Sequence, residues 1–556
     1  MIPGAFVVLL ISLCKGDGHQ PIVTTEWAHI QGNLLQFEGK SVAEFLGIPY
    51  AKPPTDGLRF QAPQPLDIPS EQDRPTFDAT KAPPFCKSTR MPPKSVQVRP
   101  PTKIVPESED CLTLNIWTPS DSLKNGANLR PVLIHIHGGA YMFDGSRPSF
   151  KKGDILSAKG DMVVVLIKYR VGVLGCLFAD HDDIPGNVNL LDQAMAMEWV
   201  HKNIKNFGGD PDQVTLSGLS AGSISVALHF MNPEAQRLFN RIILESGAVS
   251  TDLSESVETS KRRFQITAEK IGCWKDNNIT ATISCVRKAD YELLNDAYVA
   301  SCKDIDDKIT LPHCLVDRGV YSQSEADKRL SMGDIPKNKP ALVTTMVDEG
   351  TVITGSLHID PQKSMADNIR YLAPAMSPGI TPDETETLVK MYLSGIQNDD
   401  EYENQRALRM ILGDINFQCP SIWFAEKLMK HVPVYTTQFT KFSDHFRTKV
   451  LMADGQNDQY GPKHGGDSSF IFGRPLRDKR NFSAADIQTS EIVMKYWIDF
   501  VNTGKVDWPA YVSGPKDTVI PFQYEVRSDK VVPFTRLDPR YQFCQVWKQI
   551  HYKNGF

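Results

Sequence analysis

The segment Val214–Phe230 constrains the fold of this chain more than any other part of the sequence. A short apolar strand runs directly into Gly218-Leu219-Ser220-Ala221-Gly222, and the apolar run Ile224–Phe230 can continue as a helix. Small residues on both sides of a serine permit a sharp strand-to-helix turn, which presents the hydroxyl above the sheet at a helix N-terminus. Taken alone, the five-residue segment is also compatible with an ordinary glycine turn.

Other segments predict the sheet into which this turn would fit. The runs Pro131–Ile136 and Met162–Ile167 are apolar, rich in β-branched residues and bounded by turn residues, which predicts buried strands. Apolar residues between Leu190 and Ile204 recur at helical spacing, and a turn at Phe207–Gln213 precedes the strand Val214–Ser217. Strands that alternate with helices predict an α/β fold with a large central, mostly parallel twisted sheet covered by helices on both faces.

A second glycine-containing segment, His137–Tyr141 (HGGAY), follows the predicted strand that ends at Ile136. Residues without bulk let backbone N–H groups approach a reacting carbonyl oxygen that becomes negatively charged. We expect Gly139, Ala140 and Ala221 to supply these N–H groups. The alternative is a simple glycine turn, and we assign His135 and His137 to packing rather than to chemistry.

Longer stretches carry a family resemblance. Phe207–Gly222 (FGGDPDQVTLSGLSAG) resembles the active-site signature of the type-B carboxylesterase and cholinesterase family, and Glu109–Trp117 (EDCLTLNIW) resembles its second signature. Similar stretches also occur at Phe45–Pro54, Leu58–Phe60 and Leu191–Ile204, so the resemblance covers nearly the whole chain. It implies an α/β-hydrolase fold and hydrolysis of small carboxylic esters without a cofactor.

The resemblance also implies a catalytic triad. It places the acid on Glu349 in Asp348-Glu349-Gly350 and the histidine on His464, with Ser220 as nucleophile. The order Ser, Glu, His is that of α/β-hydrolases. In the implied mechanism an acyl-enzyme forms on Ser220, His464 transfers the proton and Glu349 orients His464. Outside this context the glutamate could be a surface acid and the histidine incidental.

Several structural pairings follow from the same resemblance. It implies an ion pair between Arg59 and Glu109, and hydrogen bonding by Ser246 around the acid. It also implies disulfides that join Cys86 to Cys111, Cys273 to Cys285 and Cys419 to Cys544. Of the cysteines that remain after these pairs, we expect Cys302 to pair with Cys314, because their short separation would close a small loop, and Cys176 to be a buried free thiol.

Three features depart from the family pattern. Leu219 stands before the serine, where members carry an acidic or amide side chain. The stretch between Lys87 and Asp110, where cholinesterases place a choline-binding tryptophan, contains no aromatic residue. Ala140 replaces a third glycine. We therefore expect a general carboxylesterase with poor selectivity for choline esters.

The N-terminus indicates export. The apolar run Ala5–Leu13 ends in small and polar residues and predicts a signal peptide at 1–18, with a buried first strand as the alternative. Residues 19–556 then form one domain, without any later apolar stretch of membrane-spanning length. We therefore expect a secreted, extracellular protein with disulfides. Asn278 and Asn481 lie in sequons, so we also expect it to be a glycoprotein.

Composition excludes other classes of function. A net charge of −5 over 556 residues provides no basic surface for nucleic acid. Cysteines and histidines show no zinc-ligand spacing, so we expect no metal. Two alternatives to an ordinary esterase remain: a catalytically weak or inactive adhesion protein of the same fold, and a stoichiometric scavenger of toxic esters. The sequence leaves the oligomeric state open.

Overall fold

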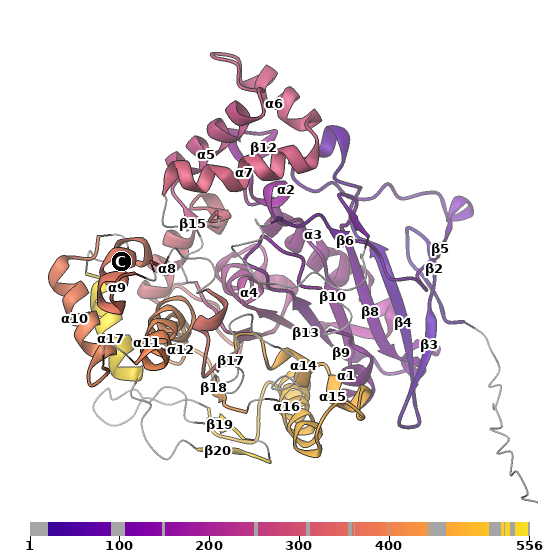
Figure 1. Cartoon of the computed structure of the whole chain (residues 1–556). Helices are drawn as coiled ribbons and strands as arrows, with labels where there is room; N and C mark the ends of the chain where they lie inside the picture. The colour runs from indigo at the N-terminus through magenta and orange to yellow at the C-terminus, as the bar shows by residue number, and fades with distance from the viewer. Residues whose placement is uncertain are drawn as a thin grey trace, which may run out of the picture.

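A computed structural model of the chain describes residues 20–553, except 91–105, 147–150, 250–253, 307–311, 354–358, 361, 378, 398–399, 442, 444–462, 511–523, 528 and 534–539. In the described part, an 11-stranded sheet runs through the middle of the molecule and helices lie on both sides of it (Figure 1). The predicted α/β fold is confirmed. The predicted signal peptide at 1–18 lies outside the described residues.

The strands of the large sheet are β3 (Asn33–Phe37), β4 (Lys40–Pro49), β8 (Thr113–Pro119), β9 (Arg130–Ile136), β10 (Val163–Ile167), β13 (Gly209–Leu219), β14 (Arg241–Glu245), β17 (Ala341–Met346), β18 (Val434–Phe439), β19 (Tyr524–Val526) and β20 (Val531–Pro533). Their spatial order is β20-β19-β18-β17-β14-β13-β9-β10-β8-β4-β3. From β19 to β10 all neighbours are parallel. The strands β20 at one edge and β8, β4 and β3 at the other are antiparallel.

The helices are α1 (Asp154–Gly160), α2 (Val173–Cys176), α3 (Val188–Asn203), α4 (Ala221–Met231), α5 (Val257–Lys270), α6 (Ile279–Lys288), α7 (Tyr291–Ile305), α8 (Gln323–Met332), α9 (Met365–Met376), α10 (Pro382–Leu393), α11 (Glu401–Gly413), α12 (Cys419–Leu428), α14 (Ser468–Ile471), α15 (Arg474–Arg477), α16 (Ala484–Thr503) and α17 (Arg540–His551). Short strand pairs add to the periphery: β1 (Ile22–Thr24), β2 (His29–Gln31) and β5 (Thr76–Asp78), β6 (Phe85–Cys86) with β7 (Glu107–Ser108), β11 (Phe178–His181) with β12 (Ile184–Pro185), and β15 (Ser254–Glu255) with β16 (Leu315–Val316).

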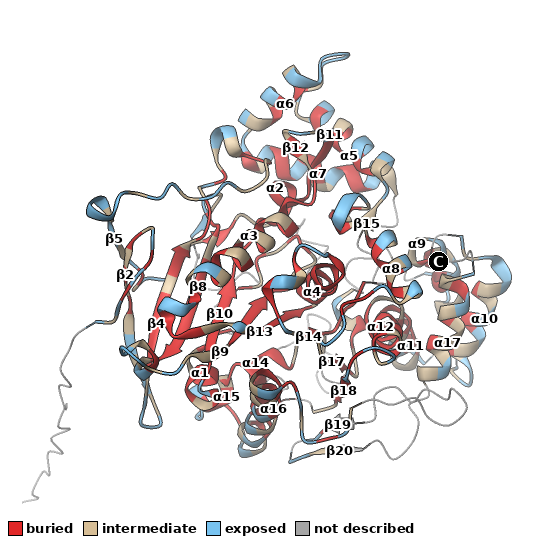
Figure 2. Ribbon diagram, turned by 180° about the vertical axis from the view of Figure 1, so that it is seen from behind, coloured by how far each residue is buried: buried red, intermediate tan, exposed pale blue. Residues whose placement is uncertain are grey.

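The central strands are buried on both faces, as Figure 2 shows for β9, β10 and β13. Successive side chains of a strand point to opposite faces. In β9, Val132 and Ile134 therefore belong to the apolar cluster that includes residues of α4, whereas Leu133 belongs to the separate cluster that includes residues of α16. This explains why these strands are continuously apolar runs rather than alternating ones.

The predicted elements occur with shifted boundaries. The helix expected between Leu190 and Ile204 is α3, and its last predicted residue, Ile204, begins a 3-10 turn. Part of the turn expected at Phe207–Gln213 belongs to β13, because Gly209 already pairs with Arg130 of β9. The register of this pairing shifts between Gly209 and Val214. A β-bulge of this kind adds residues to one strand without ending the ladder, and turn-forming residues alone do not reveal it.

The cysteine pairing corrects one expectation. The structure joins Cys86 to Cys111, Cys273 to Cys285 and Cys419 to Cys544, as the resemblance implied. However, Cys176 is bonded to Cys314, and among the described cysteines it is Cys302 that is free and buried. The expected pairing of Cys302 with Cys314 was wrong because α7 packs Cys302 against Arg263 of α5, whereas the fold brings Cys314 beside α2. Proximity in space, rather than in sequence, decides which sulfurs can bond.

Candidate active site

Ser220 sits in a strained turn between β13 and α4. Its backbone has φ 58° and ψ −125°, a conformation that few non-glycine residues adopt, and its N–H donates to Glu245 O at 2.8 Å. The side chain is partly accessible, in contrast to the buried strand that precedes it. The predicted turn thus places the serine hydroxyl at the carboxyl end of a central strand and at the N-terminus of α4.

The glycines of this turn are required by close packing. A Cβ added to Gly222 would lie 2.2 Å from Ile136 O, and one added to Gly218 would lie 2.2 Å from Gly222 O. Backbone oxygens cannot yield at such distances, so any side chain here would displace α4 from β9. The spacing of glycines around Ser220 therefore has a direct steric cause.

Glu349 and His464 come together from loops that follow β17 and precede α14. Glu349 is 2% exposed, and its Oε1 accepts a hydrogen bond from Met346 N at 2.7 Å. Its Oε2 lies 2.6 Å from His464 Nδ1. A backbone bridge between Asp348 and Lys463 holds the two loops side by side. The carboxylate thus fixes the orientation of the imidazole and favours a proton on Nδ1.

The residues next to the serine and the histidine, Leu219 and Gly465, are in contact. His464 Nε2 is buried and has no hydrogen-bond partner among the described residues. The Leu219 side chain lies against the residue that follows the histidine, with its Cδ2 3.1 Å from the Cβ position of Gly465. In unliganded enzymes the hydrogen bond between a catalytic base and its nucleophile is often long, and it shortens when substrate binds. The structure therefore brings the Ser220 turn and the His464 loop into contact.

The segment after β9 lies against the serine. A Cβ on Gly138 would be 2.9 Å from Ser220 Cβ. The next three residues, Gly139, Ala140 and Tyr141, all have positive φ, of 121°, 53° and 60°. In the described part of the chain, no hydrogen bond is made by the N–H groups of Gly139, Ala140 or Ala221. The segment that carries two of the predicted donors, Gly139 and Ala140, therefore begins directly beside the Ser220 turn.

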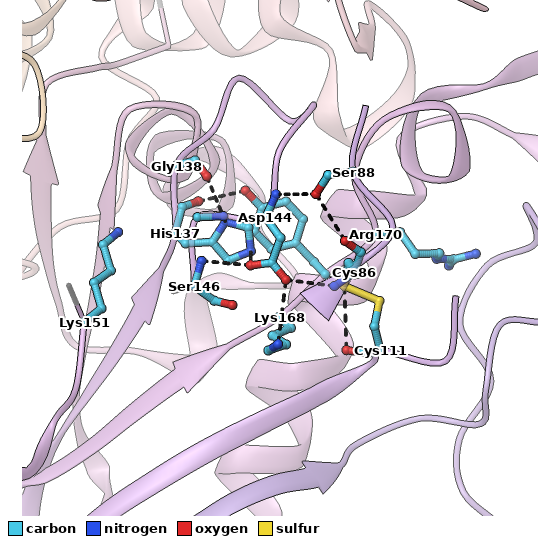
Figure 3. A network of polar contacts seen from close by, with 12 residues as sticks. Cys86, Ser88, Cys111, His137, Gly138, Asp144, Ser146, Lys151, Lys168 and Arg170 are labelled. Carbon is cyan, nitrogen blue, oxygen red and sulfur yellow. Dashed lines mark hydrogen bonds and ion pairs between the residues drawn. A yellow bond between two sulfur atoms is a disulfide. The ribbon is translucent and has the colours of Figure 1, made fainter. Parts of the chain in front are cut away.

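A buried polar network holds this loop, as Figure 3 shows. Asp144 Oδ1 accepts from Ser146 N at 2.8 Å, and Asp144 Oδ2 accepts from Cys86 N at 2.9 Å. Lys168 Nζ lies 3.7 Å from Asp144 Oδ2. Burial alone would raise the pKa of Asp144, but His137 and Lys168 hold it below its ordinary value. The network ties the loop to the disulfide of Cys86.

His137 belongs to the same network without carrying charge. Burial lowers its pKa to about 4, so the imidazole is neutral near pH 7. Its ring stacks on Tyr169 with centroids 4.2 Å apart, and Gly145 N donates to its Nδ1 at 3.1 Å. This contact pattern agrees with a packing and loop-shaping residue, which is the role assigned to it from sequence.

A second buried cluster of ionisable groups lies behind the Glu349–His464 pair. Lys151 Nζ donates to His135 Nε2 at 3.2 Å, and His135 Nδ1 lies 3.7 Å from Glu245 Oε1. Burial raises the pKa of Glu245, and burial together with the Glu349 charge raises the pKa of Asp467 to about 7. Burial lowers the pKa of both His135 and Lys151. Burial thus disfavours the charged form of each of these four groups.

Other expected contacts have mixed outcomes. Arg59 and Glu109 form a two-pronged ion pair at 2.7 and 2.8 Å. The expected hydrogen bond of Ser246 around the acid is not found: its Oγ is buried without a partner among the described residues. Both sequon asparagines, Asn278 and Asn481, are exposed.

Sequence reasoning missed Asp144, Asp467 and the ring of Phe417, which contacts His464. The loop position of Asp467 soon after His464 was the only available signal, and nothing in the sequence pointed to Phe417. Among the described residues, no group of three metal-binding side chains is close enough to hold an ion.

Comparison with known proteins agrees with this geometry. The profile of the carboxylesterase family matches residues 19–544, and the chain belongs to this family of carboxylic ester hydrolases. It is 30% identical to acetylcholinesterase-1 of Trittame loki over 92% of this chain and 94% of that protein. It is 31% identical to carboxylesterase 1C of Mus musculus over 91% of both chains, and 29% identical to cholinesterase of Mus musculus over 97% of this chain and 89% of that protein.

Proposed function

We propose that the protein is a secreted serine carboxylesterase with Ser220, His464 and Glu349 as its catalytic triad. The observation that carries this proposal is the 2.6 Å contact between His464 Nδ1 and Glu349 Oε2, on loops packed against the Ser220 turn. Ser220 and Glu349 follow the carboxyl ends of β13 and β17, and His464 contacts Glu349, which supports the assignment of these three residues to a triad.

In the proposed reaction, His464 Nε2 takes the proton of the Ser220 hydroxyl as the oxygen attacks the ester carbonyl. The carbonyl oxygen becomes negative and accepts hydrogen bonds from the N–H groups of Gly139, Ala140 and Ala221. Protonated His464 then gives its proton to the departing alcohol, which leaves an acyl-enzyme. Water, deprotonated by His464, releases the acid and restores the serine. No cofactor takes part in these steps.

The proposed substrates are general carboxylic esters rather than choline esters. The similarity to cholinesterases and to a carboxylesterase is about equal, so it does not decide the substrate. Leu219 supports the general preference, because an apolar side chain packed on Gly465 provides no negative charge beside the site. The absence of aromatic residues between Lys87 and Asp110 also removes the means of holding a quaternary ammonium group by its positive charge.

The proposed location is extracellular. Disulfides form and persist in oxidising compartments, and four of them join described residues of the chain. Among the described helices, none combines the length and the apolarity needed to cross a bilayer. The apolar run Ala5–Leu13 would direct export, and the exposed Asn278 and Asn481 would then be open to glycosylation.

The test is to secrete the protein from a eukaryotic host and measure hydrolysis of nitrophenyl butyrate and butyrylthiocholine. We expect turnover of the nitrophenyl ester that disappears in Ser220→Ala and persists in Ser324→Ala, a serine replacement on α8. Hydrolysis of the choline ester should be much weaker.

Other outcomes would favour the alternatives. A burst of nitrophenol equal to the enzyme concentration, followed by slow turnover, would indicate a stoichiometric scavenger. If folded wild-type protein were as inactive as Ser220→Ala, the esterase proposal would be withdrawn in favour of a binding protein.

A further inference from the structure

The aromatic ring of Phe417 lies on the imidazole of His464. The ring centroids are 4.2 Å apart and the planes are inclined by 32°. The rings are therefore tilted, and their centroids are closer than in most edge-to-face pairs. Phe417 is 6% exposed and the His464 side chain is 7% exposed, so solvent scarcely screens the contact.

Phe417 reaches this position through an irregular turn of helix. α11 ends at Gly413, the π-helix Asp414–Gln418 follows, and α12 begins at Cys419. A π-helical turn inserts a residue and changes the direction of the side chains that it carries, and such turns are frequent at functional sites. The aromatic contact with His464 is thus produced by a departure from regular helical geometry.

Contacts from the C-terminal helix hold the π-helix in place. Asp414 Oδ2 accepts a hydrogen bond from the Tyr392 hydroxyl at 2.8 Å, and Trp547 Nε1 of α17 donates to the same hydroxyl at 2.9 Å. The disulfide of Cys419 with Cys544 joins the end of the turn to α17. These contacts fix an otherwise unfavourable helical turn.

The same helical segment also supports the acid. A Cβ on Gly413 would lie 3.2 Å from Glu349 Cβ and 2.8 Å from Gly350 N, so the backbone of α11 packs directly on the Glu349 turn. Gly413 and Phe417 therefore contact the two members of the Glu349–His464 pair from one continuous helix. Displacement of this helix would alter both residues together.

The chemistry of the proposed reaction gives the ring a role. His464 becomes a cation when it takes the proton of Ser220, and the face of an aromatic ring attracts a cation within about 6 Å of its centroid. We propose that Phe417 is a positioning residue that also stabilises the positive charge of His464 in the transition state. This inference deepens the proposed esterase function and rests on it.

Several ionisable groups lie around His464. Glu349 faces Nδ1, while Asp467, on the loop of His464, responds to the charges of both residues. Lys151 and Glu245 interact electrostatically with Asp467. Phe417 is the neighbour whose ring covers the imidazole face, so its effect can be varied without altering any of these charges.

The experiment replaces Phe417 by phenylalanine carrying one, two or three ring fluorines, introduced by nonsense suppression into the full-length protein. Fluorine weakens the negative face of the ring and hardly changes its shape. We expect kcat for nitrophenyl butyrate to fall stepwise, by about 3- to 10-fold at three fluorines. The acid limb of the kcat/KM profile should move stepwise to lower pH, because a less stabilised imidazolium forms only at lower pH.

Matched controls separate this effect from simple packing. The same fluorinated residues at Phe424, a buried ring of α12 that contacts Phe230, should change neither kcat nor the acid limb. Phe417→Leu should lose more activity than the fluorinated forms, whereas Phe417→Tyr should retain most of the wild-type activity. If the wild-type enzyme were active but kcat and the acid limb stayed the same across the fluorinated Phe417 series, the proposal for Phe417 would be wrong. A wild-type protein without Ser220-dependent activity would instead overturn the proposed function itself.

Discussion

The carboxylate of Asp144 accepts a hydrogen bond from the backbone N–H of Cys86 at 2.9 Å. This contact joins two segments far apart in the sequence: the loop that presents Gly139 and Ala140, and the disulfide of Cys86 with Cys111. The loop backbone has positive φ at Gly139, Ala140 and Tyr141, and a strained conformation persists only where its surroundings enforce it.

Asp144→Asn should therefore reduce activity by displacing the loop. The amide would point an N–H group toward Cys86 N or Ser146 N, so one hydrogen bond would be lost and a buried donor left unpaired. We expect kcat to fall about 10- to 100-fold with a smaller change in KM, because the N–H groups proposed to face the developing charge would be displaced. Ser146→Ala should behave as wild type, since Ser146 contributes its backbone N–H and its Oγ makes no hydrogen bond within the described structure. Equal kcat values for the two variants would contradict this assignment.

Glu349→Gln should remove most of the activity while preserving the fold. An amide is nearly the same size as the carboxylate but cannot stabilise the positive charge on His464, and it can impose the wrong tautomer. We expect kcat to fall about 10³- to 10⁴-fold. Asp348→Asn is the matched control, because Asp348 faces Arg409 and the Thr351 hydroxyl rather than His464. Comparable losses in both variants would show that the loop as a whole, and not the Glu349 charge, is responsible.

Cys302 should be the one thiol that reacts when a chain starting at residue 19 is unfolded without reducing agent. Burial raises the pKa of Cys302 to about 11, although Arg263 acts in the opposite direction, so the native thiol is protonated and inaccessible at pH 8. We expect slow reaction with iodoacetamide in the native protein and rapid reaction in denaturant. Peptide mapping by mass spectrometry identifies the modified residue. A label on Cys176 or Cys314 would contradict the bond between them.

Asp467→Asn should make the stability of the protein less dependent on pH. Burial and the charge of Glu349 raise the pKa of Asp467 to about 7, above the ordinary value of 3.8. The folded state thus binds a proton that the unfolded state releases between about pH 4 and 7, so the wild type loses stability as pH rises through this range. In thermal unfolding, the fall in Tm between pH 5 and pH 8 should be smaller for Asp467→Asn. Replacement of the exposed Asp507 by asparagine should leave the wild-type fall in Tm unchanged. If Asp467→Asn also showed the wild-type fall, the assignment to Asp467 would be refuted.

Local sequence patterns were sufficient for several elements of the fold. Continuous apolar runs predicted β9 and β10, because strands covered on both faces need apolar side chains at every position. The serine turn was predictable because close backbone contacts at Gly218 and Gly222 exclude side chains, which leaves a recognisable spacing. Glu349 and His464, in contrast, were assigned through the longer family resemblance, since neither residue has a local pattern of its own.

What the sequence by itself determined, then, was the class of fold, the turn at Ser220 and the family. The tertiary structure decided the partner of Cys176, the buried neighbours of the His464 loop and the contact of Phe417 with the imidazole. The physical reason is range: backbone turns and strand periodicity depend on residues close together in the chain. Disulfide partners, pKa shifts and ring contacts depend instead on which distant segments the packed sheet and helices bring together.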